Sequence, residues 1–284
     1  MSLTVLEKSN LSKVATQVRR DVVRMVHGAK GGHPGGALGC TDLFVLLYFK
    51  YMKHHKEFSM DGKDEDLFFL SNGHISAVWY STLARFGYFP VKELDSHRKI
   101  NSRLQGHPTP HEHLEGIRMA SGSLGQGLSV AIGAAHAKKL NKDSRLVYCL
   151  MGDGELQEGQ VWEAAMYAPN RQIDNLIAFV DYNGQQIDGP VDKVMSLLDL
   201  RAKWESFGWK VLESNGNDLD ELASTIEEAQ LLCGNGKPII ILMTTSMGYG
   251  VDFMMGSHKW HGVAPNDVEL EKALLQLVDG MEDY

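Results

Sequence analysis

The sequence predicts an α/β fold in which a parallel β-sheet is covered by helices on both faces. Two observations support this prediction. The composition is that of an ordinary globular protein, with 43% hydrophobic and 23% charged residues. The chain is helical at first, and strands and helices then alternate, which is typical of a parallel sheet. No repeat or low-complexity segment interrupts the chain, and its length permits one large α/β domain over residues 1–284 or two small ones.

The first half of the chain is predicted to be mainly helical. Residues 3–27 place Leu and Val side chains at helical spacing, and a glycine-rich break follows at Gly31–Gly36. A loop at 100–122 contains glycine, proline and several histidines. The remaining helices of this half are expected at 41–54, 75–87 and 127–141.

The second half of the chain supplies the strands. Helices are expected between and after them at 158–169, 197–206 and 218–233. A final helix, about Val268–Val278, carries leucines on one face, and we expect it to pack on this chain rather than on a partner. In sheets of this kind, ligands bind beyond the carboxyl ends of the strands. The strands are predicted at Leu146–Met151, Leu176–Asp181, Trp209–Glu213 and Ile239–Met243.

Charge, hydropathy and cysteine content bear on the class of partner and on the cellular compartment. The net charge of −8 gives no reason to expect nucleic acid or an acidic membrane surface as a partner. The longest clean apolar run, Ile239–Met243, is far too short to span a membrane. The N-terminal residues contain no apolar h-region, so we expect no secretory signal. Three cysteines without a CxxC motif are typical of a reducing, cytoplasmic setting.

Oxygen ligands follow two consecutive predicted strands. The first strand runs into Gly152-Asp153-Gly154, and the second is followed by Asn183 and Gln185. Because consecutive strands of such a sheet can be neighbours, we expect Asp153 and Asn183 to lie side by side. Their side chains, a main-chain oxygen such as that of Gln185, and ligand phosphates make a suitable Mg²⁺ or Ca²⁺ shell. Either segment alone is more often a simple turn, so the prediction rests on the pair.

Several histidines lie next to glycines in loops rather than on helix faces. Neutral imidazole can hydrogen-bond a phosphate or sugar oxygen and can exchange a proton near pH 7. A zinc site is the rival interpretation, because His107, His111 and His113 are close in sequence. It is disfavoured, since no cysteine joins them and no HExxH motif is present.

These segments together resemble the transketolase family. The similarity runs from about residue 12 to 265 and keeps the family's order of motifs. It implies the thiamine-diphosphate-binding fold, specifically the domain that holds the cofactor's pyrophosphate. The matching segments are Gly32-His33-Pro34-Gly35-Gly36, Ser71-Asn72-Gly73-His74, Gly106-His107-Pro108, Gly122-Ser123-Leu124-Gly125-Gln126-Gly127, Gly152–Gly159 and Gly256–Gly262.

The resemblance implies a role for each residue of the site. Asp153, Asn183 and the main-chain oxygen of Gln185 are expected to hold the metal, which is Mg²⁺ by default, with Ca²⁺ or Mn²⁺ as substitutes. His33, His107 and His261 are expected to face the donor sugar and to be the catalytic histidines. The residues expected to contact thiamine diphosphate are His74, Gly122, Ser123, Leu124, Gly154, Glu158, Asn183, Ile187 and His261.

Two loops depart from the family pattern. The segment after His33 reads Pro34-Gly35-Gly36-Ala37-Leu38-Gly39, where the family has GHPGAPLG from the glycine before that histidine. Ser123 replaces the proline of the family's GPLGQG motif. Both departures lie near the expected substrate channel, so they bear on substrate preference and not on cofactor binding.

The resemblance also implies a partner. The family's pyrimidine-side and C-terminal domains, which supply the glutamate that hydrogen-bonds the aminopyrimidine and the arginines that bind the sugar phosphate, are absent from these residues. We therefore expect a split transketolase acting on sugar phosphates, in which two copies of this chain assemble with two copies of a C-terminal subunit. Glu158 and Glu163 match family glutamates between active sites and are not substitutes for the missing glutamate.

Alternative interpretations differ in how well they fit. Ser71–His74 and Gly256–Gly262 argue against a 1-deoxyxylulose-5-phosphate synthase and against the α-chain of a dehydrogenase E1 component. A nicotinamide dehydrogenase fails, because no GxGxxG motif follows a strand. A split transketolase for a sulfonated or branched sugar stays open, as does a non-catalytic cofactor-binding fragment.

Overall fold

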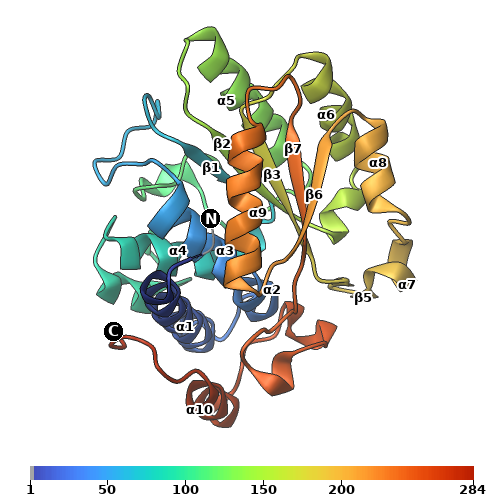
Figure 1. The fold of residues 1–284 in the computed structure, drawn as a ribbon. Coiled ribbons are helices and arrows are strands. Elements are labelled where there is room, and N and C mark those ends of the chain that lie inside the picture. The colour runs from blue at the N-terminus through green and yellow to red at the C-terminus, as the bar shows by residue number, and fades with distance from the viewer. Residues whose placement is uncertain (1–2) are drawn as a thin grey trace.

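A five-stranded parallel sheet forms the centre of the computed structural model, which describes residues 3–284 (Figure 1). The strand order is β1-β2-β3-β7-β6, and every neighbouring pair is parallel. The predicted parallel sheet is therefore confirmed. The strands are β1 (Leu67–Leu70), β2 (Val147–Gly152), β3 (Leu176–Tyr182), β6 (Lys210–Asn215) and β7 (Ile239–Thr244).

Helices cover both faces of the sheet, as predicted. Alternate residues of one strand enter different cores, since Leu150 of β2 packs in one hydrophobic cluster and Met151 in the other. Figure 1 shows α9 crossing in front of the strands. The Leu150 face packs against α1 (Val5–Gly28), α3 (Thr41–Leu46), α4 (Ser76–Phe86) and α9 (Leu219–Leu232); the Met151 face packs against α5 (Gly127–Leu140), α6 (Gly159–Asn170) and α8 (Leu200–Ser206).

Side-chain caps fix where the long helices begin. The Thr4 hydroxyl accepts a hydrogen bond from the Glu7 N–H, and the Glu7 carboxylate accepts one from the Thr4 N–H, which is a capping box. Asp218 caps α9 by accepting hydrogen bonds from the Asp220 and Glu221 N–H groups. Asn266 and Glu269 form a second capping box at α10 (Asp267–Gln276). The predicted starts of these helices lie within a few residues of the observed ones.

Three local predictions need correction. β1 was not predicted, because its four residues, Leu67–Leu70, are too few to show a period. The expected glycine-rich break at Gly31–Gly36 ends early, since Pro34 is the first residue of the short buried helix α2 (Pro34–Gly39). The expected helix 41–54 is shorter, because α3 passes at Leu47–Tyr51 into a π-helical turn.

The C-terminal helix packs on its own chain, as predicted. Ala273 and Leu277 are buried in the same core as α1. The segment beyond α10 is held by Arg20, whose Nη2 lies 2.7 Å from Asp283 Oδ2. After β3, a small antiparallel ribbon of β4 (Gln185–Gln186) and β5 (Gly189–Pro190) leads into α7 (Val191–Met195).

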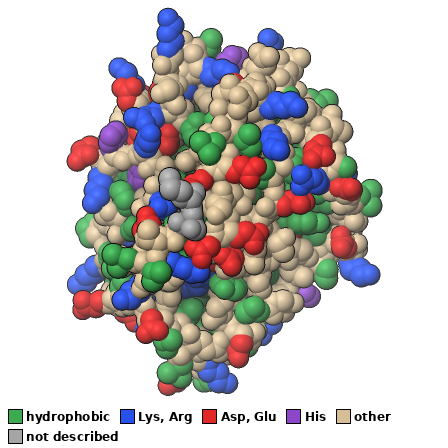
Figure 2. Space-filling view, in the orientation of Figure 1, with side chains coloured by type: hydrophobic (Ala, Val, Ile, Leu, Met, Phe, Trp, Pro, Cys, Tyr) green, Lys and Arg blue, Asp and Glu red, His purple; other side chains and the backbone are tan. Residues whose placement is uncertain are grey.

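The surface carries both signs of charge. On the face that Figure 2 shows, Lys and Arg side chains are interspersed with Asp and Glu. Within residues 3–284, no helix combines the length and the hydropathy needed to cross a membrane.

Candidate functional site

A cavity of about 370 Å³ opens at the carboxyl edge of the sheet. Its walls come from segments far apart in sequence, and they bring together nearly all the residues predicted for the site. This is the edge at which parallel α/β sheets bind ligands. The predicted residues that line it are His33, His74, His107, Gly122, Leu124, Asp153, Gly154, Glu158, Asn183, Gln185, Ile187 and His261.

Asp153 and Asn183 are neighbours because β2 and β3 are adjacent. Gly152, at the end of β2, is in register with Asp181 of β3. The Gly184 N–H donates to Asp153 Oδ2 at 2.6 Å, which ties the two strand ends together. Asn183 Nδ2 donates to Asp181 Oδ2 at 2.8 Å, and this contact orients the amide of Asn183. The predicted side-by-side placement is confirmed.

The acidic pair at these strand ends favours a cation. Asp153 and Asp181 are each 2% exposed. Burial, and then the neighbouring Asp181 carboxyl, raise the pKa of Asp153 to about 7. Burial also raises the pKa of Asp181. Within residues 3–284, no lysine or arginine forms an ion pair with either carboxyl. A divalent cation at Asp153 would remove this cost, so the residues fit a metal ion.

Four histidines lie together in the lining of the cavity. The ring centroid of His33 lies 5.0 Å from that of His74, 6.2 Å from that of His107 and 5.6 Å from that of His261. The His74 and His261 centroids are 5.0 Å apart.

Partial removal from solvent lowers the pKa values of these imidazoles and so favours their neutral forms. Desolvation, followed by the influence of His261 and His107, lowers the pKa of His33 to about 4. Burial is also the largest cause that lowers the pKa values of His74, His107 and His261. Neutral rings present both a donor and an acceptor, so they can hydrogen-bond a polar ligand and can take up a proton.

Two buried polar atoms in the cavity lack a partner. Asn72 is 1% exposed, and its Oδ1 atom has no hydrogen bond; the same holds for the buried Nδ1 atom of His33. Buried polar groups are nearly always hydrogen-bonded, so these atoms point to a polar ligand in the cavity.

Gly122 allows His107 to reach the cavity. Its φ of +124° is a conformation that other residues rarely adopt, and a Cβ atom there would lie 2.8 Å from His107 Cδ2. The loop and the histidine are therefore packed directly on each other.

One predicted residue lies elsewhere, and other residues of the site were missed. Ser123 is exposed and does not belong to the cavity lining. Asn72 and Glu155 do line it, although only their neighbours in the motifs were predicted. Asp181 also lines it, and its signal was its position at the predicted strand end. Met247 carried no signal in the sequence.

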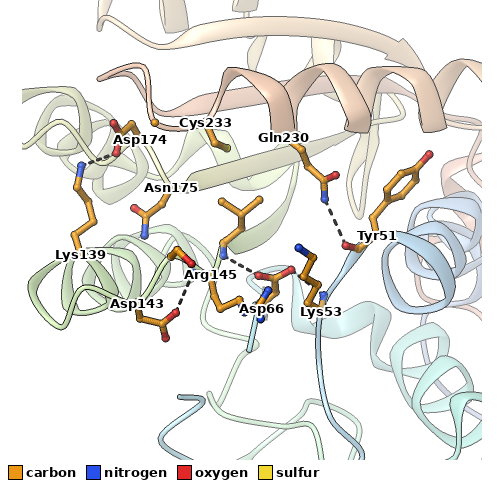
Figure 3. A pocket seen from close by; sticks show the side chains of 13 residues that line it. Tyr51, Lys53, Asp66, Lys139, Asp143, Arg145, Asp174, Asn175, Gln230 and Cys233 are labelled. Atoms are coloured by element: carbon orange, nitrogen blue, oxygen red, sulfur yellow. Dashed lines mark hydrogen bonds and ion pairs between the residues drawn. The ribbon is translucent and has the colours of Figure 1, made fainter. Parts of the chain in front are cut away.

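A second hollow, of about 520 Å³, lies at the opposite, amino edge of the sheet (Figure 3). Its charged side chains are largely paired: Lys139 with Asp174, and Asp143 with Lys138.

In the part of the chain that the structure describes, no three His, Cys, Asp or Glu side chains converge to hold a metal ion. The set predicted here differs in kind, since it combines one carboxylate with an amide and a main-chain oxygen.

Comparison with known proteins agrees with this geometry. The family model described as "Transketolase, thiamine diphosphate binding domain" matches residues 11–282. An apulose-4-phosphate transketolase subunit of Phocaeicola vulgatus is 38% identical, over 93% of this chain and 92% of that protein. A 6-deoxy-6-sulfo-D-fructose transketolase subunit of a Clostridium species is 36% identical, over 95% of this chain and 97% of its own.

Solved structures show the same fold. The transketolase of Leishmania mexicana superposes with a TM-score of 0.87 at 30% identity, over 94% of this chain. The match spans only 41% of that longer chain. The family model and these relatives together show that the chain belongs to the transketolase family and corresponds to its thiamine diphosphate-binding domain.

Proposed function

We propose that this chain is the pyrophosphate-side subunit of a split transketolase, which transfers a two-carbon ketol unit from a ketose phosphate to an aldose phosphate. One observation carries the proposal: a single cavity joins the buried Asp153 and its neighbour Asn183 to four histidines whose pKa values are lowered. The first feature suits a metal-bound diphosphate, and the second suits a hydroxylated substrate.

The metal is held by Asp153, Asn183 and the main-chain oxygen of Gln185. Hard oxygen ligands of this kind, completed by phosphate oxygens, suit Mg²⁺, and Ca²⁺ or Mn²⁺ can replace it. The raised pKa of Asp153, caused first by burial, supports a cation at this position. His74, His261 and Gly154 contact the diphosphate.

The remaining lining residues position the cofactor and the donor sugar. Bound thiamine diphosphate supplies the nucleophilic carbon that this C–C bond chemistry requires. Leu124 and Ile187 provide apolar contact for its rings, beside Gly122 and Glu158. His33, His107 and His261 hydrogen-bond the sugar hydroxyls. Because they are neutral, they can accept the hydroxyl proton whose removal precedes C–C cleavage.

A second subunit completes the active site. Residues 1–284 constitute one pyrophosphate-side domain, and the pyrimidine-side and C-terminal domains belong to the partner. The support comes from relatives of about the same length that are named transketolase subunits. A complex of two copies of each subunit follows from the two-fold symmetry that is usual in oligomers. The three cysteines, which form no CxxC motif, are typical of a reducing compartment and so suit a cytoplasmic enzyme.

A second candidate differs only in the sugar. The relatives of similar length are named for apulose 4-phosphate and for 6-deoxy-6-sulfo-D-fructose. Gly36, Ala37 and Ser123 depart from the common family pattern, and Gly36 lines the cavity. These observations favour testing branched and sulfonated sugars beside the pentose phosphates.

A ketol-transfer assay tests the proposal. Xylulose 5-phosphate and ribose 5-phosphate are supplied with thiamine diphosphate and Mg²⁺ to this chain alone and to this chain with its pyrimidine-side subunit. We expect turnover only with the partner. Turnover by the chain alone would contradict the split site. Inactivity of a verified complex on pentose phosphates, with activity on a branched or sulfonated ketose, would establish the second candidate.

A further inference from the structure

Glu155 is a buried carboxylate for which the proposed function gives no role. It is 2% exposed and lies on the 3₁₀ turn Gly154–Gln157, directly after the predicted metal ligand. Its two oxygens accept three hydrogen bonds. Oε1 accepts from the Ser71 hydroxyl and, at 2.7 Å, from the Gly125 N–H, and Oε2 accepts from the Gly152 N–H at 3.1 Å.

The three donors belong to three segments that contribute residues to the lining of the site cavity. Ser71 begins the turn that carries Asn72 and His74, and Gly125 belongs to the loop 122–127 that carries Leu124. Gly152 ends β2, immediately before Asp153. One carboxylate therefore joins three segments. They carry the unpaired amide oxygen of Asn72, the apolar side chain of Leu124 and the predicted metal ligand Asp153.

Ser71 adds a second link between two of these segments. Its Oγ donates to Glu155 and accepts from the Gly127 N–H at 3.0 Å. The backbones approach so closely that a Cβ atom on Gly127 would lie 2.4 Å from Ser71 Cβ. The loop 122–127 is thus fixed at Gly125 by Glu155 and at Gly127 by Ser71, and its other side packs on His107 through Gly122.

We propose that Glu155 is a positioning residue, whose carboxylate holds the loop 122–127 and the Ser71–His74 turn in register with the Asp153 strand end. This inference rests on the proposed function and extends it. Its consequence is that the two halves of the cofactor site, oxygen ligands on one side and loop on the other, keep a fixed separation without a ligand. Such pre-organisation raises affinity because less ordering accompanies binding.

Asp66 provides a matched control at the opposite edge of the same sheet (Figure 3). It is 4% exposed, and its oxygens accept the Lys53 N–H and the Leu146 N–H, each at 2.8 Å. It is likewise a buried carboxylate that joins separate backbone segments, but it lies far from the cavity lining. A purely structural effect of losing such a group should appear equally at Asp66.

The test compares Glu155→Gln and Asp66→Asn in the chain assembled with its partner subunit. The glutamine of Glu155→Gln places an N–H donor against one of the three donors, so one link is lost. We expect thiamine diphosphate, titrated in Mg²⁺, to bind Glu155→Gln about tenfold more weakly than wild type, as the loss of a charged hydrogen bond implies. Asp66→Asn should keep wild-type affinity even where it unfolds at lower urea.

A second measurement does not depend on the cofactor. Hydrogen exchange of the chain without ligand should become faster in Glu155→Gln at residues 122–127 and 71–74, whereas Asp66→Asn should affect the amino edge. Ser71→Ala is the milder variant if Glu155→Gln does not fold, and it should speed exchange at the same two segments.

Two outcomes separate the inference from the proposed function. Wild-type affinity and wild-type loop exchange in Glu155→Gln would overturn the positioning role while leaving the function intact. A wild-type complex that does not bind thiamine diphosphate would overturn the function, and the exchange pattern would still decide whether Glu155 holds the loop.

Discussion

His261 lies where two tasks of the site meet. Its ring is 5.0 Å from that of His74, on the predicted diphosphate side, and 5.6 Å from that of His33, on the predicted sugar side. Burial lowers its pKa, so the ring is neutral and can exchange a proton. A single substitution here should therefore affect binding and chemistry together.

We predict that His261→Ala weakens thiamine diphosphate binding by about tenfold, the cost of one hydrogen bond to a charged group. Turnover at saturating cofactor should fall by about a hundredfold or more, as loss of acid–base assistance implies. Calorimetry and steady-state kinetics on the assembled enzyme measure the two effects. His258→Ala is the control, since His258 is exposed on the same 3₁₀ turn and outside the cavity lining. Equal behaviour of both variants would remove the assignment.

The buried imidazoles make stability depend on pH in a defined direction. Burial, with His261 and His107, lowers the pKa of His33 from 6.5 to about 4. Between these two values the unfolded chain binds more protons than the folded chain, so the free energy of unfolding decreases as the pH falls through this window.

We predict that the urea midpoint of the chain without ligand is lower at pH 5 than at pH 7, and that this difference is smaller in His33→Gln. The substituted chain keeps the contributions of the other buried histidines, including His97, whose pKa burial lowers to about 4. An unchanged pH dependence in His33→Gln would show that His33 does not titrate on unfolding.

For single residues, the motifs indicated most of the side chains that line the cavity. They did not indicate the contacts between loops. Asp153 and Asn183 could be paired because both follow strands of one sheet. Glu155 could not be assigned a role, because its partners Ser71 and Gly125 are distant in sequence. Ser123 does not line the cavity for a related reason: the motif identifies the loop but not which of its side chains turn inward.

The elements position the site through close packing of loops on strand ends. The loop 122–127 leads into α5, and Gly122 has a φ of +124°, where a Cβ atom would lie 2.8 Å from His107 Cδ2. A side chain at this position has no space and an unfavourable backbone conformation.

We predict that Gly122→Ala destabilises the chain by about 1–3 kcal/mol, the usual cost of such strain, and weakens binding of thiamine diphosphate. Gly133→Ala is the control on α5, because nothing lies within 4 Å of a Cβ atom there. It should stabilise the chain by about 0.5–1 kcal/mol through better helix propensity. Urea unfolding of both variants decides the matter, and stabilisation of Gly122→Ala would contradict the packing argument.

Helices and strands were predicted correctly where the apolar pattern extended over enough residues, and they were missed where the segment was short. The 24 residues of α1 and the strands β2, β3, β6 and β7 were recognised from their apolar patterns. β1 has four residues, and its place at the sheet edge depends on pairing with β2, which no local pattern encodes. The buried helix α2 was mistaken for a break, because its glycines are poor helix formers and only packing stabilises them.

The two edges of the sheet differ in their titratable groups. The hollow at the amino edge contains ion pairs such as Lys139–Asp174, while at the carboxyl edge burial raises the pKa of Asp153 and lowers that of His33. The strand order β1-β2-β3-β7-β6 places the ends of β2 and β3 at the centre of the sheet. The local patterns indicated that β2 and β3 are neighbours but not the order of the other strands, so the fold class was predictable and the full topology was not.

We predict that the chain forms a complex with its pyrimidine-side subunit, because the proposed site needs groups from both. The two-fold symmetry that is usual in oligomers predicts two copies of each subunit. Native mass spectrometry of the co-expressed proteins measures the stoichiometry. A one-to-one complex with full turnover would contradict the two-fold arrangement, and the absence of any complex would contradict the split enzyme.

We propose that this chain carries the metal and diphosphate half of a thiamine diphosphate site. The most direct test is calorimetric titration of thiamine diphosphate into the assembled protein, with Mg²⁺ or with EDTA, for wild type and for Asp153→Asn. We predict binding only for wild type with Mg²⁺. Affinity in Asp153→Asn should fall by more than about a hundredfold, since loss of even an outer partner of a metal ligand costs ten- to a hundredfold. Equal affinity in the two proteins, or binding that EDTA does not change, would contradict the account.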